Sequence, residues 1–506
     1  MAAWRAEADG MEMEKALTRL KALQAKLHAY EHAENIIYYD SVTAAPADTD
    51  EGRGETLGVL TGEAYALFAT PETERLLAFL EERADALTPE LRRQTELLRR
   101  RYRKMSYIPQ EEYVEYQKLV NSAQHVWHRA KEENDFPAFA PYLQRLISMK
   151  KRFAELYDSA KDPYDVMLDE YEPGMTRAAL DPFFERLRAD IVPLIEKIRG
   201  AHAAIRDDFL YREYPAAGQR ALADELMTLM GIDRRHCGLG ETLHPFTITF
   251  NNKDVRITTN YDERNLASSL YSVVHEGGHA LYELNTADEF EGTCLAGGVS
   301  MGIHESQSRL FENVIGRSRA FVSVVYRKCR EIFPEQLRDV TEEELYRAVN
   351  KCVPSLIRTE ADEVTYCLHV MVRYEIEKGL FAGSIRVDEL PAVWAEKMNA
   401  YLGVSVPDDA RGVLQDSHWS GGDFGYFPSY AVGSAYAAQI AAAISKALDI
   451  DACVRNGEIP KITALLRDGL YRFGCLYDPA ALLERFCGEP FNPAYYTNYL
   501  TEKYHG

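Results

Sequence analysis

The segment from residue 275 to 279 reads His-Glu-Gly-Gly-His and lies within a stretch, residues 261 to 285, whose apolar side chains recur at helical spacing. In a helix, His275 and His279 lie four residues apart on one face, and Glu276 lies beside them. This pattern is typical of a zinc-binding helix that carries its own general base. The chain must therefore fold so that another element approaches this helix and completes the site.

The predicted helix has two further features that constrain its surroundings. Asn260 or Asp262 is available as its N-cap, and the Asn285-Thr286 step would end it. Gly277 and Gly278 each cost about 1 kcal/mol relative to alanine inside a helix. We therefore expect a neighbouring strand or the substrate to approach the helix closely at these two glycines.

A catalytic zinc ion keeps three protein ligands and leaves one position for water, whose pKa falls to about 7 on the metal. Two histidines are not enough, so a third ligand must come from elsewhere. Glu305 is the favoured candidate because it lies in a second predicted helix, Gly298 to Ile315, and His304 is the competing candidate. Glu276 lies between the two histidines and is predicted to act as the general base.

One β-hairpin is predicted directly before the metal-binding helix. Phe246 to Phe250 and Val255 to Thr259 are short β-branched runs, and the turn-forming residues 251 to 254 join them. Such a hairpin could offer an exposed edge to which an extended peptide adds as a further strand. It could equally serve only to cover the helix, and the residues leave both interpretations open.

Helical periodicity dominates the rest of the chain, and nothing in it resembles a linker. The predicted fold is mainly α, with two helical lobes around a deep groove and a small β-hairpin or sheet beside the metal-binding helix. We expect one domain over residues 1–506, with a helical N-terminal part to about residue 240 and a metal-site part from about 241 onward. The predicted N-terminal helices are Met11 to Asn35, Glu55 to Phe68, Pro71 to Leu87, Pro89 to Arg103, Gln110 to Glu132, Phe136 to Asp158, Arg177 to Ile205 and Ala221 to Met230, and a second set follows Ser318.

Composition excludes some classes of partner. With 79 acidic and 58 basic residues, the formal charge of −21 opposes binding to a nucleic-acid backbone. The eight cysteines have no paired spacing, the N-terminal residues do not resemble a signal peptide, and no apolar run is long enough to span a bilayer. We therefore expect a cytoplasmic protein with reduced thiols and no membrane partner.

Four further motifs accompany the His-Glu-Gly-Gly-His segment in a fixed order. They are D-x-R-x-T at Asp254 to Thr258, H-E-S-Q at His304 to Gln307, I-R-x-x-A-D at Ile357 to Asp362, and G-x-x-Q-D-x-H-W at Gly412 to Trp419. On these motifs the chain resembles the thermostable metallocarboxypeptidase family typified by carboxypeptidase Taq. The likeness covers nearly the whole chain.

The resemblance implies a mostly helical, groove-shaped peptidase with a gluzincin-type site. It implies the metal ligands His275, His279 and Glu305 and the general base Glu276. It also implies removal of single C-terminal residues from peptides with broad specificity, zinc or cobalt as the metal, and a homodimer. The spacing of the residues alone supports only metal-assisted hydrolysis.

Two arginines are candidates for binding the free carboxylate at the end of such a substrate. Arg358 offers a guanidinium fork suited to bidentate carboxylate recognition, although it could instead form an ordinary ion pair, perhaps with Asp362. Arg256 competes for the same role. Its place on a strand beside Asp254 makes a structural ion pair the favoured interpretation of Arg256.

A zinc hydrolase also needs a donor aimed at the oxyanion of the tetrahedral intermediate. His418 and Tyr430 are the candidates, with Tyr426 as the fallback, and Trp419 is predicted to be a packing residue. An endo-oligopeptidase on a similar scaffold and an inactive peptide-binding protein are the alternatives. The intact Glu276 argues against the binding protein, and a requirement for a free substrate carboxylate would exclude the endo-oligopeptidase.

Overall fold

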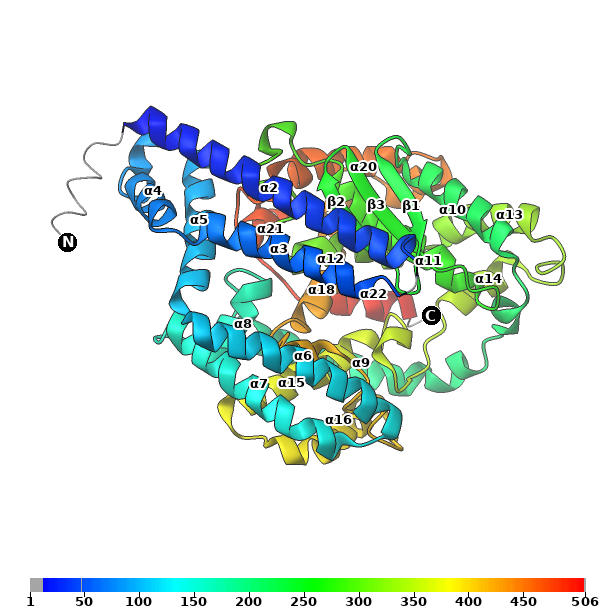
Figure 1. Ribbon diagram of the computed structural model, residues 1–506. Coiled ribbons are helices and arrows are strands. Elements are labelled where there is room, and N and C mark those ends of the chain that lie inside the picture. The colour runs from blue at the N-terminus through cyan, green and yellow to red at the C-terminus, as the bar shows by residue number, and fades with distance from the viewer. Residues whose placement is uncertain (1–11, 47, 505–506) are drawn as a thin grey trace.

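The computed structural model describes residues 12–46 and 48–504, so the predicted helix start at Met11 and most of the N-terminal stretch considered for a signal peptide lie outside the described residues. Figure 1 shows long helices in the upper and in the lower part of the molecule, with a small sheet in the upper part. Among the described residues, none of the helices combines the length and apolar character needed to cross a bilayer. The predicted mainly α fold with a small sheet is confirmed.

Helices form where capping residues and apolar periodicity coincide. Thr70 accepts a hydrogen bond from the backbone N–H of Thr73 and is followed by a proline, which favours a helix start. The helices before the sheet are α2 (Met13–Thr43), α3 (Asp50–Phe68), α4 (Pro71–Glu81), α5 (Pro89–Tyr107), α6 (Gln110–Glu133), α7 (Phe136–Tyr157), α8 (Pro163–Tyr171), α9 (Arg177–Ala203) and α10 (Ala216–Met230).

The second set of helices follows the sheet. It comprises α11 (Leu266–Glu283), α12 (Met301–Arg309), α13 (Arg319–Ile332), α14 (Glu342–Val349), α15 (Tyr366–Ala382), α16 (Leu390–Leu402), α17 (His418–Gly421), α18 (Pro428–Ser445), α19 (Ile450–Arg455), α20 (Ile459–Gly469), α21 (Pro479–Cys487) and α22 (Ala494–Tyr504). A π-helix, η4 (Leu310–Ile315), continues α12. Single π-helical turns occur often at functional sites, and this one carries Glu312.

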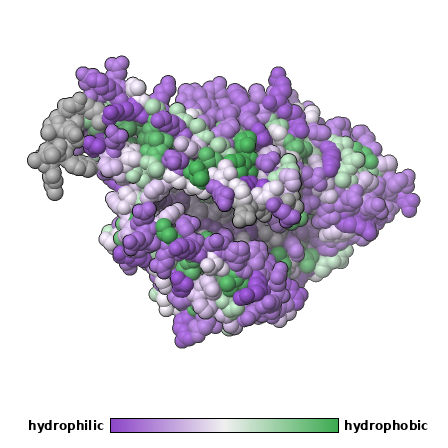
Figure 2. All heavy atoms as spheres, in the orientation of Figure 1, coloured by the Kyte–Doolittle hydropathy of each residue, from purple (hydrophilic) through white to green (hydrophobic). Residues whose placement is uncertain are grey.

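The apolar core is divided unequally. The main cluster runs from Leu119 to Tyr504 and takes residues from both sides of residue 240. A smaller cluster lies among the N-terminal helices and includes Leu20, Leu77 and Leu98. In Figure 2 a hollow separates the part that carries α2 and α3 from the part that carries α6 and α7. This hollow opens toward the region where α11 and α12 lie.

The sheet has three strands, β1 (Cys237–Glu241), β2 (Thr247–Asn251) and β3 (Asp254–Thr259), in the order β1-β3-β2. The predicted hairpin is confirmed, because β2 pairs antiparallel with β3 and the turn lies at the predicted place. Strand β1, which pairs parallel with β3, was not predicted. Its sequence contains two glycines, which have low β-propensity.

Helix α12 packs closely between α11 and α18. A Cβ atom at Gly278 of α11 would lie 2.6 Å from the backbone oxygen of Gln307, and one at Gly433 of α18 would lie 2.6 Å from the Cβ of Glu305. The close approach predicted at Gly278 is therefore present, but the neighbour is helix α12 rather than a strand or the substrate. These contacts fix the depth at which Glu305 faces α11.

Candidate metal centre and active site

Helix α11 presents the two histidines as predicted but begins later than predicted. Its N-cap is Asn265, whose side chain accepts from the backbone N–H of Ser268. The prediction of Asn260 or Asp262 as the N-cap was wrong, because Asp262 instead accepts from the backbone N–H of Arg264 in a turn before the helix. The shorter helix still carries the whole His-Glu-Gly-Gly-His segment.

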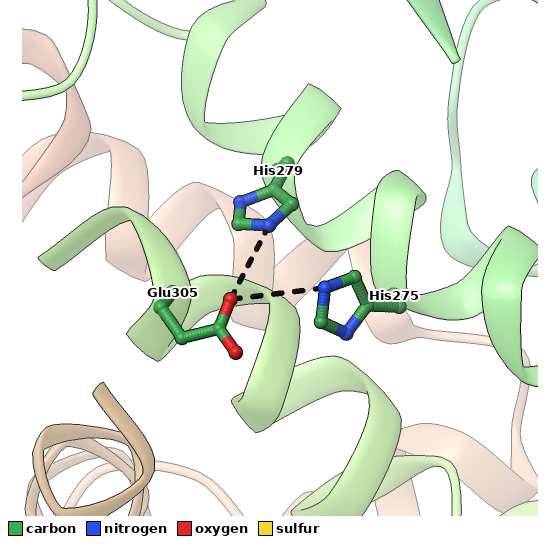
Figure 3. Close-up of side chains that lie close together, drawn as sticks. All are labelled: His275, His279 and Glu305. Carbon is green, nitrogen blue, oxygen red and sulfur yellow. Dashed lines mark ion pairs between the residues drawn. The ribbon is translucent and has the colours of Figure 1, made fainter. Parts of the chain in front are cut away.

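His275, His279 and Glu305 converge on one point (Figure 3), and their candidate ligand atoms all lie within 4.8 Å of one another. The Oε2 atom of Glu305 lies 3.7 Å from Nε2 of His275 and 3.5 Å from Nε2 of His279. Two ligand atoms about 2.0–2.1 Å from a tetrahedral zinc ion lie about 3.3–3.4 Å apart. The two-nitrogen, one-oxygen set therefore fits a zinc-sized ion.

A buried carboxylate orients His275. The Nδ1 atom of His275 lies 2.8 Å from Oε2 of Glu312. Arg309 also donates to Oε2 of Glu312, and Arg317 donates to Oε1. Burial opposes ionisation of Glu312, but Arg309 and the other cations beside it outweigh burial and hold the pKa of this carboxyl well below its usual value. An ionised Glu312 accepts a hydrogen bond from the protonated Nδ1 of His275. The Nε2 atom of His275 is then unprotonated and free to bind a metal ion.

Groups on its own helix hold the carboxylate of Glu305, the candidate third ligand, in place. Nε of Arg309 donates to Oε1 at 2.6 Å, and the hydroxyl of Ser308 donates to Oε2 at 2.9 Å. Burial raises the pKa of the Glu305 carboxyl, but Arg309 and the two histidines lower it well below the usual range. Glu305 is therefore ionised, which a metal ligand requires.

His304, the competing candidate for third ligand, lies behind His279 rather than beside the cluster. Its Nδ1 is 2.6 Å from Nδ1 of His279, and its Nε2 is 2.7 Å from Oε1 of Glu283. Burial opposes ionisation of Glu283, but hydrogen bonds from His304, Gly298 and Thr249 lower the pKa of its carboxyl. The geometry thus favours Glu305 over His304 as a ligand.

Glu276, the candidate general base, follows His275 in α11, and its side chain contacts strand β2. Its carboxyl group is buried against strand β2, where the hydroxyl of Thr247 donates to Oε2 at 2.6 Å. Thr247 lies on β2, an edge strand of the sheet. Because Thr247 bonds to Glu276, the predicted hairpin does more than cover the helix. It holds one oxygen of Glu276 and leaves the other for a proton-transfer partner.

A cavity of about 1270 Å³ opens beside His275. His275 and Glu276 line it on the helix side, which we define as α11, α12 and η4. Arg358, Tyr366 and Tyr430 line it on the loop side, which we define as residues 353–366 and 412–430. His275 of the candidate metal cluster and Arg358, the candidate carboxylate anchor, therefore border the same space.

Arg358 is buried, and its ion pair differs from the one considered from the sequence. Nε and Nη2 donate to Oδ1 of Asp416 at 3.1 and 2.8 Å, and Nη1 donates to the hydroxyl of Tyr366 at 3.1 Å. Asp362 does not pair with Arg358, because it accepts from the backbone at the start of α15 and from Val353. Burial raises the pKa of Asp416, but Arg373 and Arg358 lower it below the usual range, so the pair stays charged.

Tyr430 and His418 lie together on the loop side. The Tyr430 hydroxyl is 3.5 Å from Nε2 of His418, and the guanidinium of Arg358 lies 5.0 Å from the Tyr430 ring centre. Burial, reinforced by Arg358, lowers the pKa of His418 to about 4, so its imidazole is neutral at pH 7. Trp419 is buried and donates to Glu377, in line with a packing role.

Arg256 occupies a different environment. It donates to both carboxylate oxygens of Asp254, and its guanidinium lies 4.5 Å from the ring centre of Phe250 and 5.1 Å from that of Tyr39. It is absent from the residues that line the large cavity within the described part of the chain. This placement favours the structural ion pair over a role in substrate binding.

Four supporting residues were not found from the sequence: Thr247, Glu283, Glu312 and Asp416. Glu312 lies seven residues after Glu305, and Glu283 lies four residues after His279, so helical spacing could have indicated both. Thr247 and Asp416 act across the fold. Without a tertiary structure, the sequence carries no spacing signal for either contact.

Comparison with known proteins identifies the lineage. Residues 19–504 match the family model for carboxypeptidase Taq (M32) metallopeptidases. The chain belongs to this family. Carboxypeptidase 1 of Bacillus subtilis is 38% identical over 483 residues, which cover 95% of this chain and 96% of the relative. Thermostable carboxypeptidase 1 of Pyrococcus furiosus is 34% identical over 500 residues, or 96% of this chain and 98% of the relative.

Solved structures of M32 carboxypeptidases share the fold as well. The crystal structure of the Deinococcus radiodurans enzyme has a TM-score of 0.94 and 37% identity, covering 97% of this chain and 98% of that chain. Trypanosoma cruzi metallocarboxypeptidase 1 has a TM-score of 0.94 and 34% identity, covering 97% and 100%. The chain is therefore a metallocarboxypeptidase, and the predicted fold and enzyme class are confirmed.

Proposed function

We propose that this enzyme is a zinc exopeptidase that removes single residues from the free C-terminus of peptides, with His275, His279 and Glu305 as the metal ligands. The observation that carries the proposal is the convergence of these three ligand atoms at the edge of a cavity that Glu276 and Arg358 also border. Two imidazoles and one carboxylate suit zinc, and cobalt is the second choice. A divalent ion bound there supplies a positive charge that activates water and polarises the scissile carbonyl.

Glu276 is the general base in this proposal. It lies next to His275 in the chain, and its side chain faces the same cavity. With Thr247 holding Oε2, Oε1 takes a proton from the attacking water and later delivers it to the leaving amine. The hydrogen bond from Thr247 restricts the rotation of the carboxylate, so proton transfer begins from an aligned geometry.

Arg358 is the carboxylate anchor. A guanidinium has five N–H donors, and the contacts with Asp416 and Tyr366 use three of them. The two that remain lie on Nη1 and Nη2, the edge that suits bidentate pairing with a carboxylate. Asp416 fixes the other edge, so the fork is oriented before substrate binds.

Tyr430 and His418 stabilise the oxyanion on the loop side. Tyr430 lines the cavity and carries a hydroxyl that can donate, because burial raises its pKa well above the usual value. His418 is neutral and lies behind it at 3.5 Å, so it positions the hydroxyl. Donors aimed at developing negative charge contribute about 3–4 kcal/mol each in comparable hydrolases.

The remaining properties follow from the size of the cavity, the free thiols and the family resemblance. A cavity of about 1270 Å³ with polar and apolar lining supports broad specificity for the C-terminal side chain. Eight free cysteines support a reducing compartment, and we place the enzyme in the cytoplasm with peptides as its substrates and no nucleic-acid partner. A homodimer is proposed from the family resemblance alone.

The test compares one N-blocked peptide with a free C-terminus and the same peptide with an amidated C-terminus. The chelator-stripped protein should be inactive, and adding zinc or cobalt should restore stepwise release of single C-terminal residues from the free peptide only. Mass spectrometry of the products measures this directly. Internal cleavage of the amidated peptide would favour the endo-oligopeptidase alternative, and no cleavage of either peptide would favour a binding protein.

A further inference from the structure

His304 is a half-buried polar residue beside the proposed metal centre that the proposed chemistry does not use. Its ring lies 4.7 Å from that of His279 and 5.2 Å from that of Tyr282, centre to centre. Both of its nitrogens have partners, Nδ1 with His279 and Nε2 with Glu283. Because His279 engages one nitrogen of His304 and Glu283 engages the other, neither nitrogen is left for a metal ion, so His304 must have a different task.

The hydrogen bonds that link Glu283, His304 and His279 can have only one direction. Oε1 of Glu283 accepts from the backbone N–H of Gly298 at 2.9 Å, so it is an acceptor, and Nε2 of His304 donates to it. The Nδ1 atom of His304 is then a bare acceptor, and Nδ1 of His279 must carry the proton between them. This leaves Nε2 of His279 with a lone pair that faces Glu305.

Close packing holds the imidazole of His304 in place. A Cβ atom at Gly298 would lie 2.5 Å from Cδ2 of His304, so only glycine allows the backbone to approach the imidazole this closely. Tyr282 covers the ring, and Tyr471 stacks on Tyr282 at 4.9 Å. The His304 ring therefore has little freedom to turn away from His279 or Glu283.

We propose that His304 is a positioning residue for the metal centre, which relays the orientation set by Glu283 to the ligand His279. This inference rests on the proposed metal centre and goes beyond it. Metal-bound histidines usually donate directly to a carboxylate, a carbonyl or water, as His275 does to Glu312. His279 instead reaches its carboxylate through a second imidazole.

The test measures the metal dissociation constant by competition with a chelator. His304→Leu should raise the zinc Kd by about 10–100-fold, the usual effect of losing the partner of a ligating histidine. Glu283→Gln should raise it in the same direction, and the double variant should be no worse than His304→Leu, because the two residues act in one chain. His304→Gln keeps an acceptor and a donor, so its Kd should fall between those of His304→Leu and the wild type.

The cobalt-loaded proteins supply a second readout that is independent of activity. The visible bands of cobalt report the arrangement of its ligands, so they should shift in His304→Leu and stay unchanged in His125→Leu, an exposed histidine variant on α6. Thermal melts of the metal-free variants check folding. If His304→Leu does not fold, the Glu283→Gln and His304→Gln comparison carries the test.

Two results would overturn the proposal. A wild-type Kd and cobalt spectrum in His304→Leu would make His304 a packing residue. A loss of metal as complete as that of His279→Ala would make it a ligand. Failure of the wild-type protein to bind metal would instead overturn the proposed metal centre itself, and this outcome is distinguishable because it appears before any variant is compared.

Discussion

The helix side and the loop side of the cavity are built in different ways. On the helix side, side chains of α11 contact side chains of α12 and η4, as His279 contacts His304 and His275 contacts Glu312, and charged groups surround the candidate ligands. On the loop side, Asp416 pairs with Arg358 and with Arg373, and aromatic rings lie against Arg358. From this difference we infer that the helix side binds the metal ion and transfers the proton, and that the loop side binds the terminal carboxylate of the substrate.

This division has a direct experimental consequence. Variants on the loop side should keep the metal and change which substrates are cleaved. Variants of the ligands and their partners on the helix side should change metal binding, and a variant of the base should change the chemical step alone. Measuring metal content beside activity therefore separates the two sides.

Among the variants that should retain zinc, Glu276→Gln is expected to lose the most activity. The variant should bind a full equivalent of zinc while kcat falls by about 10²–10⁴-fold, because general acid–base catalysis is lost and no ligand is removed. Metal analysis and a peptidase assay on the same sample check this. Ordinary activity in the variant would remove Glu276 from the mechanism.

Arg358→Ala should lower kcat/KM for the free peptide by about 10–150-fold, because a charge-assisted bidentate contact contributes on the order of 1.5–3 kcal/mol. Its metal content should match that of the wild type, and the gap between free and amidated peptides should shrink. Arg256→Ala is the matched control, since Arg256 is paired with Asp254 outside the cavity.

Two outcomes would contradict this assignment of the anchor. One is a selective loss in Arg256→Ala instead of Arg358→Ala. The other is loss of zinc from Arg358→Ala, which would mean that the loop side also builds the metal centre. Thermal melts must accompany the assays, because Asp416 is left without one of its two arginines in this variant.

Thr247→Val should lower kcat by about tenfold, because it removes one hydrogen bond to the Glu276 carboxylate while keeping the shape of the side chain. Thr247→Ser keeps the hydroxyl and should recover most of the activity. Zinc content should be unchanged in both variants. Equal kcat values for the valine variant and the wild type would show that strand β2 does not orient the base.

The smallest effect concerns stability rather than catalysis. The folded pKa of His418 is about 4 and its usual value is 6.5, so between these pH values the unfolded chain binds a proton that the folded protein does not. Stability should therefore fall as the pH drops from 6.5 toward 4. In the metal-free protein, His418→Gln should show a smaller fall in Tm over this window. An identical pH dependence would show that His418 is not held neutral.

The sequence predicted the helix side better than the loop side for a physical reason. The helical repeat places His275, Glu276 and His279 together without knowledge of the rest of the fold, and their spacing carries the chemistry. Arg358 was predicted to bind the substrate carboxylate, and the alternative was an ion pair for which Asp362, four residues further on, was the only partner that local spacing could offer. Its actual partner, Asp416, comes from a distant loop.

The same reasoning explains the errors in the fold. The hairpin was predicted from β-branched runs, whereas strand β1 depends on pairing with β3 and has no such signal. The start of α11 was set too early because Asp262 is a good capping residue that the structure uses in a turn instead. Local sequence propensity was enough to predict the hairpin and α11. Tertiary contacts determine where α11 begins and allow β1 to form.

The central claim is that His275, His279 and Glu305 hold the metal ion on which cleavage depends. Anomalous diffraction at the zinc edge from crystals of the zinc-loaded enzyme tests it most directly. The account predicts one strong peak about 2.0–2.2 Å from Nε2 of both histidines and from Oε2 of Glu305. A peak coordinated by His304 in place of Glu305, or no peak at this cluster, would contradict it.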